Sequence, residues 1–380
     1  MARNWDIFCS VIDNFGDIGV CWRLARQISS GSGQSVRLWV DDLASFHRLC
    51  RDVDPARISQ FIGAIEVRRW SEPFQRVEPA DIVIEGFGVR LPDVYLEAMA
   101  ARRPQPAWIN LEYLSAESWV DDCHGLPSPH PRLPLVKHFY FPGYTPATGG
   151  LLMESGVART RAAFQDDPSA VAAFWNSLGL EPAIGEALRV SLFCYENAAL
   201  PALVEAWSSD VRPVVCVVSE STVLTKLSHI VDQRIEPGMC IKRRGLSIAA
   251  IPFLELDQYD RLLWACDVNF IRGEDSFMRA QLAARPLIWQ AYPQQDSAHL
   301  NKISAFLERY AVGLEPAAGT VYCTFSLAWN RDSADVGRHW AALCSQRNAI
   351  AIHAQEWAAQ LASGDSLAVK LARFGEDRLK

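Results

Sequence analysis

Two aspartates flank a glycine-containing turn near the start of the chain, in the run Asp-Asn-Phe-Gly-Asp-Ile-Gly at residues 13–19. If Asp13 and Asp17 face one pocket, like charge raises the proton affinity of one of them, which suits a general base. Gly16 and Gly19 allow a ligand close to the backbone, but Gly-x-x-Gly is not the dinucleotide-binding fingerprint, so NAD is disfavoured. A second interpretation stays open, in which Asp17 only caps the following helix and Asp13 orders the turn.

A second polar run, Arg-Gly-Glu-Asp-Ser-Phe at residues 272–277, follows an apolar strand and opens a helix. The free N–H groups of a helix start and the positive end of its dipole attract a phosphate, and Gly273 allows close approach. Arg272 could add positive charge, while the carboxylates of Glu274 and Asp275 could accept hydrogen bonds from sugar hydroxyls. The alternative is a capped helix with two favourably placed acids in its first turn.

Other patterns that could carry chemistry are weaker. In the polar and aromatic cluster at 289–302, His299 and Lys302 share one helix face, so His299 is either a catalytic or a structural histidine. The cysteine and histidines between residues 123 and 138 match no zinc spacing, so no metal site is expected. The sequence contains neither a P-loop nor a Gly-x-Ser-x-Gly elbow, which leaves a P-loop ATPase and an α/β-hydrolase unsupported.

Short apolar runs alternate with amphipathic stretches, a rhythm typical of βα units and a mostly parallel sheet. We expect strands in the first half at residues 5–12, 35–40, 64–67, 81–85 and 107–110. A second set is expected at 189–194, 213–218, 246–251, 267–271 and 286–290, with helices at 18–28, 259–266, 276–284, 297–310 and 354–379. Both candidate turns follow strands, at the edge where open parallel sheets bind ligands.

The length of 380 residues is enough for two domains. We expect a Rossmann-like domain at 1–155, a linker region at 156–188, a second Rossmann-like domain at 189–355, and a helix in 356–380 that caps the second domain or crosses back to the first. Repeated prolines between residues 115 and 150 predict a long ordered loop. The expected fold class is therefore α/β, with two doubly wound domains facing a cleft.

The composition excludes several classes of protein. Hydrophobic residues make up 49% and charged residues 21% of the chain, as in ordinary globular proteins. The formal charge of -7, from 37 basic and 44 acidic residues, argues against a broad nucleic-acid-binding surface. No apolar run approaches the ~20 residues of a membrane span, and the ten scattered cysteines fit a reducing compartment. We expect a cytoplasmic protein without nucleic-acid or membrane partners.

Two nucleotide-binding-type halves, with carboxylates on the first and an anion-binding helix on the second, describe the glycosyltransferase architecture called GT-B. The motifs at residues 13–25, 110–117, 141–152 and 272–277 also resemble one family, EarP, the protein-arginine rhamnosyltransferases of bacterial translation elongation factor P. The resemblance runs from about residue 5 to about residue 310. It implies an inverting, metal-independent enzyme without a cofactor, which moves rhamnose from dTDP-β-L-rhamnose to an arginine guanidinium of elongation factor P.

The resemblance also implies a role for each matching residue. Asp17 matches the general base, Asp13 the carboxylate that orients the guanidinium, and Glu274 an essential acid near the donor. The residues implied to shape the acceptor pocket or hold the donor are Phe15, Gly16, Tyr195, Phe253, Arg272, Gly273, Glu274, Asp275, Ser276 and Tyr292. One departure is Leu256, where the family often carries glutamine, so recognition of the base could differ in this chain.

Two other functions stay open at this point. A GT-B enzyme with the same donor could act on a small molecule or a glycan, and activity without a protein acceptor would support that alternative. A regulatory module could bind a nucleotide sugar without catalysis, in which case loss of Asp17 would leave its function intact. The first alternative differs in its acceptor, and the second in having no reaction.

Overall fold

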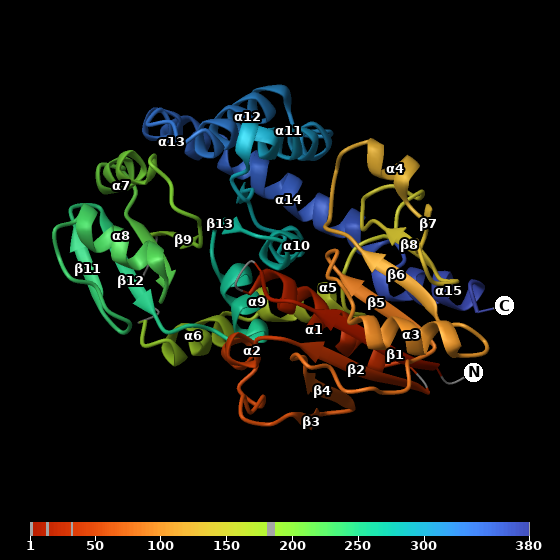
Figure 1. Ribbon diagram of the computed structural model, residues 1–380. Coiled ribbons are helices and arrows are strands. Elements are labelled where there is room, and N and C mark those ends of the chain that lie inside the picture. The colour runs from red at the N-terminus through yellow and green to blue at the C-terminus, as the bar shows by residue number, and fades with distance from the viewer. Residues whose placement is uncertain (1–2, 13–14, 32, 181–186, 380) are drawn as a thin grey trace. The chain divides into compact units, whose positions relative to one another are not determined.

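The computed structural model describes residues 3–12, 15–31, 33–180 and 187–379 (Figure 1). The chain forms two compact units: unit 1 comprises Met1–Ser155 and Gly364–Lys380, and unit 2 comprises Gly156–Ser363. Each unit is built on its own mainly parallel sheet, as the alternation of strands and helices predicted. Among the helices described, none is long and apolar enough to span a bilayer.

An eight-stranded sheet forms the centre of unit 1, in the order β3-β4-β2-β1-β5-β6-β8-β7. Its strands are β1 (Arg3–Cys9), β2 (Gln34–Val40), β3 (Ser59–Ile62), β4 (Ile65–Arg69), β5 (Ile82–Gly86), β6 (Ala107–Leu111), β7 (Pro127–Pro129) and β8 (Val136–Tyr140). The edge strands β3 and β7 pair antiparallel with β4 and β8, whereas the inner neighbours pair in parallel. Strands β5 and β6 are buried along their whole length, which explains why they appear as apolar runs in the sequence.

The last helix of the chain belongs to unit 1. The helices of this unit are α1 (Gly16–Ser29), α2 (Leu43–Leu49), α3 (Asp93–Ala101), α4 (Trp119–Cys123) and α15 (Leu367–Asp377). The single helix expected at 354–379 is divided into α14 (Arg347–Ala362) and α15. The chain leaves the helical conformation after α14, and the Ser366 side chain then caps α15 by accepting the Val369 N–H.

Helix α15 is packed tightly onto the sheet of unit 1. The Phe374 ring lies edge-on to Tyr140, with 4.9 Å between the ring centroids. Gly375 is so close to β5 that a Cβ atom there would lie 2.7 Å from Ile82 Cδ1. At the start of the helix, the Leu367 N–H donates to the Leu151 carbonyl at 2.7 Å. The final segment is therefore an integral part of unit 1.

Unit 2 contains a six-stranded sheet in the order β11-β12-β10-β9-β13-β14. Its strands are β9 (Leu188–Leu192), β10 (Val214–Ser219), β11 (Cys240–Arg243), β12 (Leu246–Ile251), β13 (Val268–Arg272) and β14 (Leu287–Gln290). Helix α14, introduced above, belongs to this unit. The remaining helices of unit 2 are α5 (Val157–Gln165), α6 (Pro168–Ser177), α7 (Leu200–Ser208), α8 (Thr222–Ile230), α9 (Leu256–Ala265), α10 (Asp275–Leu282), α11 (Ala298–Tyr310), α12 (Pro316–Asn330) and α13 (Val336–Ser345). Among the strands described in unit 2, only the edge strand β11 pairs antiparallel with its neighbour, β12.

Two stretches expected to be irregular contain regular elements. The segment 156–188, expected as a linker region, carries α5 and α6 within unit 2, and Phe174 and Trp175 of α6 are buried in its core. The segment 115–150, expected as one long loop, contains α4 and the strands β7 and β8. Strand β7 was not predicted because its prolines interrupt any apolar pattern in the sequence. An edge strand nevertheless tolerates proline.

A buried carboxylate, Asp6 of β1, ties several elements of unit 1 together and is 0% exposed. Its oxygens accept two hydrogen bonds of 2.6 Å from the Arg37 guanidinium, one of 3.0 Å from Trp39 Nε1 and one from the Tyr95 hydroxyl. The Ala80 N–H donates to the same carboxylate at 3.0 Å. Burial disfavours the charge on Arg37, but hydrogen bonding and attraction to Asp6 outweigh it, and the pKa of Arg37 is raised.

Replacing Asp6 by Ala is expected to destabilise the protein by about 3–5 kcal/mol, because breaking a buried pair leaves the partner charge uncompensated. The measurement is urea unfolding of the full chain, monitored by tryptophan fluorescence. Asp93→Ala is the matched control, since that aspartate is 63% exposed and forms only a surface pair with Arg90. A loss below about 1 kcal/mol for Asp6→Ala would show that the network contributes little.

Candidate functional site

The candidate site of unit 1 lies at the edge where its parallel strands end. Strand β1 has β2 on one side and β5 on the other, so the connections after β1 and β5 leave the sheet in a region where open α/β sheets bind ligands. Asp17 follows β1, in the first turn of α1, and Phe87 and Tyr113 follow β5 and β6. The turn that carries Asp17, chosen from the sequence, therefore lies at the point where the strand order of the sheet reverses direction.

Asp17 is only 1% exposed and both of its carboxylate oxygens accept hydrogen bonds. Oδ2 accepts the Ile12 N–H at 3.1 Å, and Oδ1 accepts the Tyr113 hydroxyl at 3.1 Å. The N-cap position of α1 is held by Phe15, so Asp17 does not occupy it. Asp13, the second predicted carboxylate, lies outside the described residues. A buried, oriented carboxylate can bind a cation or accept a proton.

The other predicted residues of this turn lie beside Asp17. Gly16 is the first residue of α1, and the Arg48 guanidinium lies 5.5 Å from the ring centroid of Phe15. Cys9 and Cys21 are both buried, and a hydrogen bond with Cys21, burial and the charge of Asp17 raise the pKa of Cys9 well above its usual value. A thiol with a raised pKa is a poor nucleophile.

The candidate site of unit 2 lies at the equivalent edge of the second sheet, where β9 is flanked by β10 and β13. Arg272 is the last residue of β13, and Gly273 follows in the left-handed region with φ of 71°. Glu274 holds the N-cap position of α10, and the buried Asp275 begins the helix. This sharp turn presents the start of a helix at the sheet edge, a geometry that favours an anion.

Aromatic rings surround the arginine of this turn. The Arg272 guanidinium lies 4.3 Å from the ring centroid of Tyr195 and 4.6 Å from that of Phe193. Tyr292, which is 61% exposed, meets Tyr195 edge-on at 5.2 Å. The Tyr195 N–H donates to the Gln290 side-chain oxygen at 2.8 Å. Arg272, Tyr195 and Tyr292, which were predicted separately, thus belong to one cluster, and stacked aromatic faces suit a guanidinium.

Three residues of this region were not predicted from the sequence. Phe193 and Gln290 directly contact the cluster, and their positions at the ends of β9 and β14 were the available signal. Tyr259 of α9 is half-buried, and the burial of its hydroxyl raises its pKa. Phe253 is half-buried in the connection after β12, while Leu256 begins α9 and is buried.

The histidines of the weaker patterns make local contacts. The ring of His299 accepts the Gln294 N–H at 3.2 Å and thereby holds the turn before α11. His124 and His138 pack around the Phe374 ring, and burial lowers the pKa of both. In the part of the chain that the structure describes, no three His, Cys, Asp or Glu side chains gather as a metal site.

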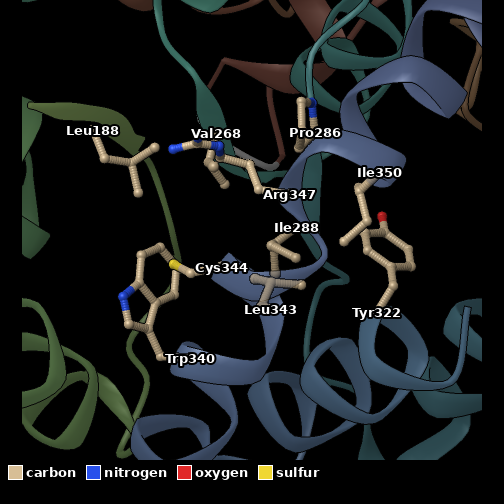
Figure 2. Close-up of a pocket in the computed structure, with 10 residues that line it drawn as sticks. All are labelled: Leu188, Val268, Pro286, Ile288, Tyr322, Trp340, Leu343, Cys344, Arg347 and Ile350. Atoms are coloured by element: carbon tan, nitrogen blue, oxygen red, sulfur yellow. The ribbon is translucent and has the colours of Figure 1, made fainter. Parts of the chain in front are cut away.

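A small apolar cavity of about 20 Å³ lies at the opposite edge of the sheet in unit 2 (Figure 2). Leu188, Val268 and Pro286 line it from the beginnings of β9, β13 and β14, and α13 and α14 cover it with side chains that include Arg347. A volume of this size holds about one water molecule. The cavity is therefore a packing gap, separate from the polar turns at the strand ends.

The sequence matches the family described as elongation factor P rhamnosyltransferase EarP over residues 5–376. The chain belongs to the EarP family. Protein-arginine rhamnosyltransferases of Pseudomonas putida KT2440 and Pseudomonas aeruginosa PAO1 are 43% and 44% identical to it, over 100% and 99% of this chain and 100% of each relative. A solved structure concerned with EarP-mediated arginine glycosylation of translation elongation factor EF-P has a TM-score of 0.72, at 32% identity and 99% coverage of both chains.

Family and fold class agree with what the motifs predicted. The EarP family was identified from four segments, and the match now extends through the C-terminal region, which had been the least distinctive part. The two mainly parallel α/β sheets and the similarity to a solved EarP confirm the GT-B fold class. The EarP family is one of glycosyltransferases, so the chain is an enzyme of that class.

Proposed function

We propose that this EarP-family protein transfers rhamnose from dTDP-β-L-rhamnose to an arginine of translation elongation factor P, with inversion and without a metal ion. The observation that carries the proposal is the buried Asp17 at the strand ends of unit 1, fixed by two hydrogen bonds. The names of the full-length relatives support the acceptor, since they are protein-arginine rhamnosyltransferases. A translation factor as acceptor also implies a cytoplasmic reaction.

Asp17 would act as the general base on the arginine side. A guanidinium is a poor nucleophile because its pKa is above about 12, so the attacking nitrogen must lose a proton as it bonds to the anomeric carbon. Asp17 accepts that proton, and Asp13 accepts hydrogen bonds from the other N–H groups of the planar guanidinium. Attack from the face opposite the leaving group inverts the β-linked donor and gives an α-linked product.

The turn at Gly273 would act on the donor side. As the bond from the anomeric carbon to the phosphate oxygen breaks, negative charge grows on dTDP. The first N–H groups of α10 and the Arg272 guanidinium stabilise this charge in place of a metal ion. Tyr195, Phe253 and Tyr292 offer aromatic faces for the base, while Glu274, Asp275 and Ser276 offer polar groups for the sugar and phosphate.

The test is intact-mass analysis of elongation factor P after incubation with the protein and dTDP-β-L-rhamnose. We expect the mass to increase by one deoxyhexosyl group, located on a single arginine, with an α-linkage by NMR. Parallel reactions use UDP-glucose and GDP-mannose, which we expect to be inactive, and EDTA, which we expect to leave the rate unchanged. Transfer to a free sugar but not to the factor would favour a small-molecule acceptor, and donor binding without any transfer would favour a regulatory module.

A further inference from the structure

We infer that Tyr113 is a positioning residue for the Asp17 carboxylate, held in place by a ring stack with Phe87. The inference rests on the proposed role of Asp17 as the base. Tyr113 lies in a segment that marks the family resemblance, but the sequence assigned it no function. Its hydroxyl donates to Asp17 Oδ1 at 3.1 Å, across 96 residues of sequence.

The two hydrogen bonds of Asp17 fix the plane of its carboxylate. Oδ2 accepts the Ile12 N–H in the connection after β1, and Oδ1 accepts the hydroxyl of Tyr113 after β6. Loss of the hydroxyl removes one of these restraints on the rotation of the carboxylate about its terminal bond, a torsion with broad minima. Because a carboxylate oxygen can accept more than one hydrogen bond, both oxygens of Asp17 can still accept one from a substrate N–H.

The Tyr113 ring is itself fixed by the neighbouring strand ends. It stacks on Phe87 with 4.4 Å between the centroids and 9° between the ring planes. Phe87 has φ of 62°, an unusual value for a side chain of this size, and its N–H donates to the Leu111 carbonyl at 2.7 Å. A phenylalanine held in this conformation is strained, and such outliers concentrate at functional sites.

A second restraint acts on the residue after Phe87. The Gly88 N–H donates at 2.9 Å to the side-chain oxygen of Asn110, which is buried at the end of β6. The connection after β5 is therefore joined to the end of β6 by backbone and side-chain hydrogen bonds. Rigid support of this kind is what a catalytic group needs to keep its geometry between turnovers.

The experiment compares Tyr113→Phe and Phe87→Leu with Tyr140→Phe in steady-state transfer to elongation factor P. Tyr113→Phe removes only the hydroxyl, so we expect kcat to fall about tenfold while KM for donor and acceptor stay within about twofold. Phe87→Leu keeps the hydroxyl but removes the stack, and kcat should fall by a smaller factor. Tyr140→Phe, which removes a hydroxyl bonded to the Gly149 carbonyl in the same unit, should match wild type.

The melting temperature of each variant separates positioning from folding. A Tyr113→Phe protein that melts as wild type and shows a reduced kcat supports the inference. Wild-type kcat in folded Tyr113→Phe, or an equal loss in Tyr140→Phe, would overturn it. If Tyr113→Phe does not fold, folded Phe87→Leu decides, since an unchanged kcat there would also overturn the inference. If Asp17 is not the general base, the result is different, because Asp17→Asn itself would then remain active.

Discussion

Asp17→Asn is expected to lower the turnover of rhamnose transfer by about a hundredfold or more, the usual scale for losing a general base. An amide keeps the size of the carboxylate and still accepts the Tyr113 hydroxyl through its oxygen, but it cannot take a proton from the guanidinium. Binding of dTDP should be unchanged, because the donor turn lies in unit 2. The measurements are single-turnover transfer by mass spectrometry and dTDP titration by calorimetry.

Asp93→Asn is the matched control for this substitution. Asp93 is also an acidic residue in the first turn of a helix, α3, but its side chain is 63% exposed. We expect this variant to turn over as wild type. Near wild-type turnover by Asp17→Asn would mean that its buried carboxylate serves the fold of the turn rather than the reaction, and the proposed mechanism would be lost.

Glu274→Ala is expected to remove most of the increase in melting temperature that the donor produces. A ligand that binds only the folded protein stabilises it in proportion to the logarithm of its concentration over Kd. The Glu274 carboxylate, at the N-cap of α10, is placed to accept hydrogen bonds from sugar hydroxyls at the anion-binding turn. The measurement is thermal unfolding at several concentrations of dTDP and of dTDP-rhamnose.

The two ligands show which part of the donor Glu274 contacts. Loss of both shifts indicates a contact to the nucleotide, and loss of the dTDP-rhamnose shift alone indicates a contact to the transferred sugar. Glu315→Ala is the control, since Glu315 holds the N-cap position of α12 in the same unit but lies outside the donor turn. Wild-type shifts with both ligands in Glu274→Ala would place the donor elsewhere in the molecule.

The local part of both candidate sites could be predicted from the sequence. Buried parallel strands form apolar runs, so the turns after β1 and β13 were visible as polar segments that interrupt them. Arg272 and Gly273 were chosen because glycine before a helix is a local pattern, and the structure places Gly273 at positive φ. The rule that ligands bind at strand ends then selected both segments, and the structure places them after the ends of β1 and β13.

The supporting contacts could not be predicted, because they join residues far apart in the chain. Nothing near Asp17 in the sequence indicates that Tyr113 reaches it, and nothing near Tyr195 indicates Gln290. Such pairs depend on which strands become neighbours, and βα periodicity leaves strand order open. Short edge strands such as β7 were missed for another reason. Three residues that include two prolines are too few to show an alternating apolar pattern.

Unit 1 contains segments from both ends of the chain, so protein synthesis completes unit 2 before unit 1. Unit 2 is one uninterrupted segment, and it is synthesised in full before Gly364–Lys380. Domains usually fold as units, N-terminal first. Here the sheet of unit 1 gains the contacts of α15 with Tyr140 and Ile82 only when this last segment has been made. The unit that carries the proposed base Asp17 is thus completed only after the whole of unit 2 has been synthesised.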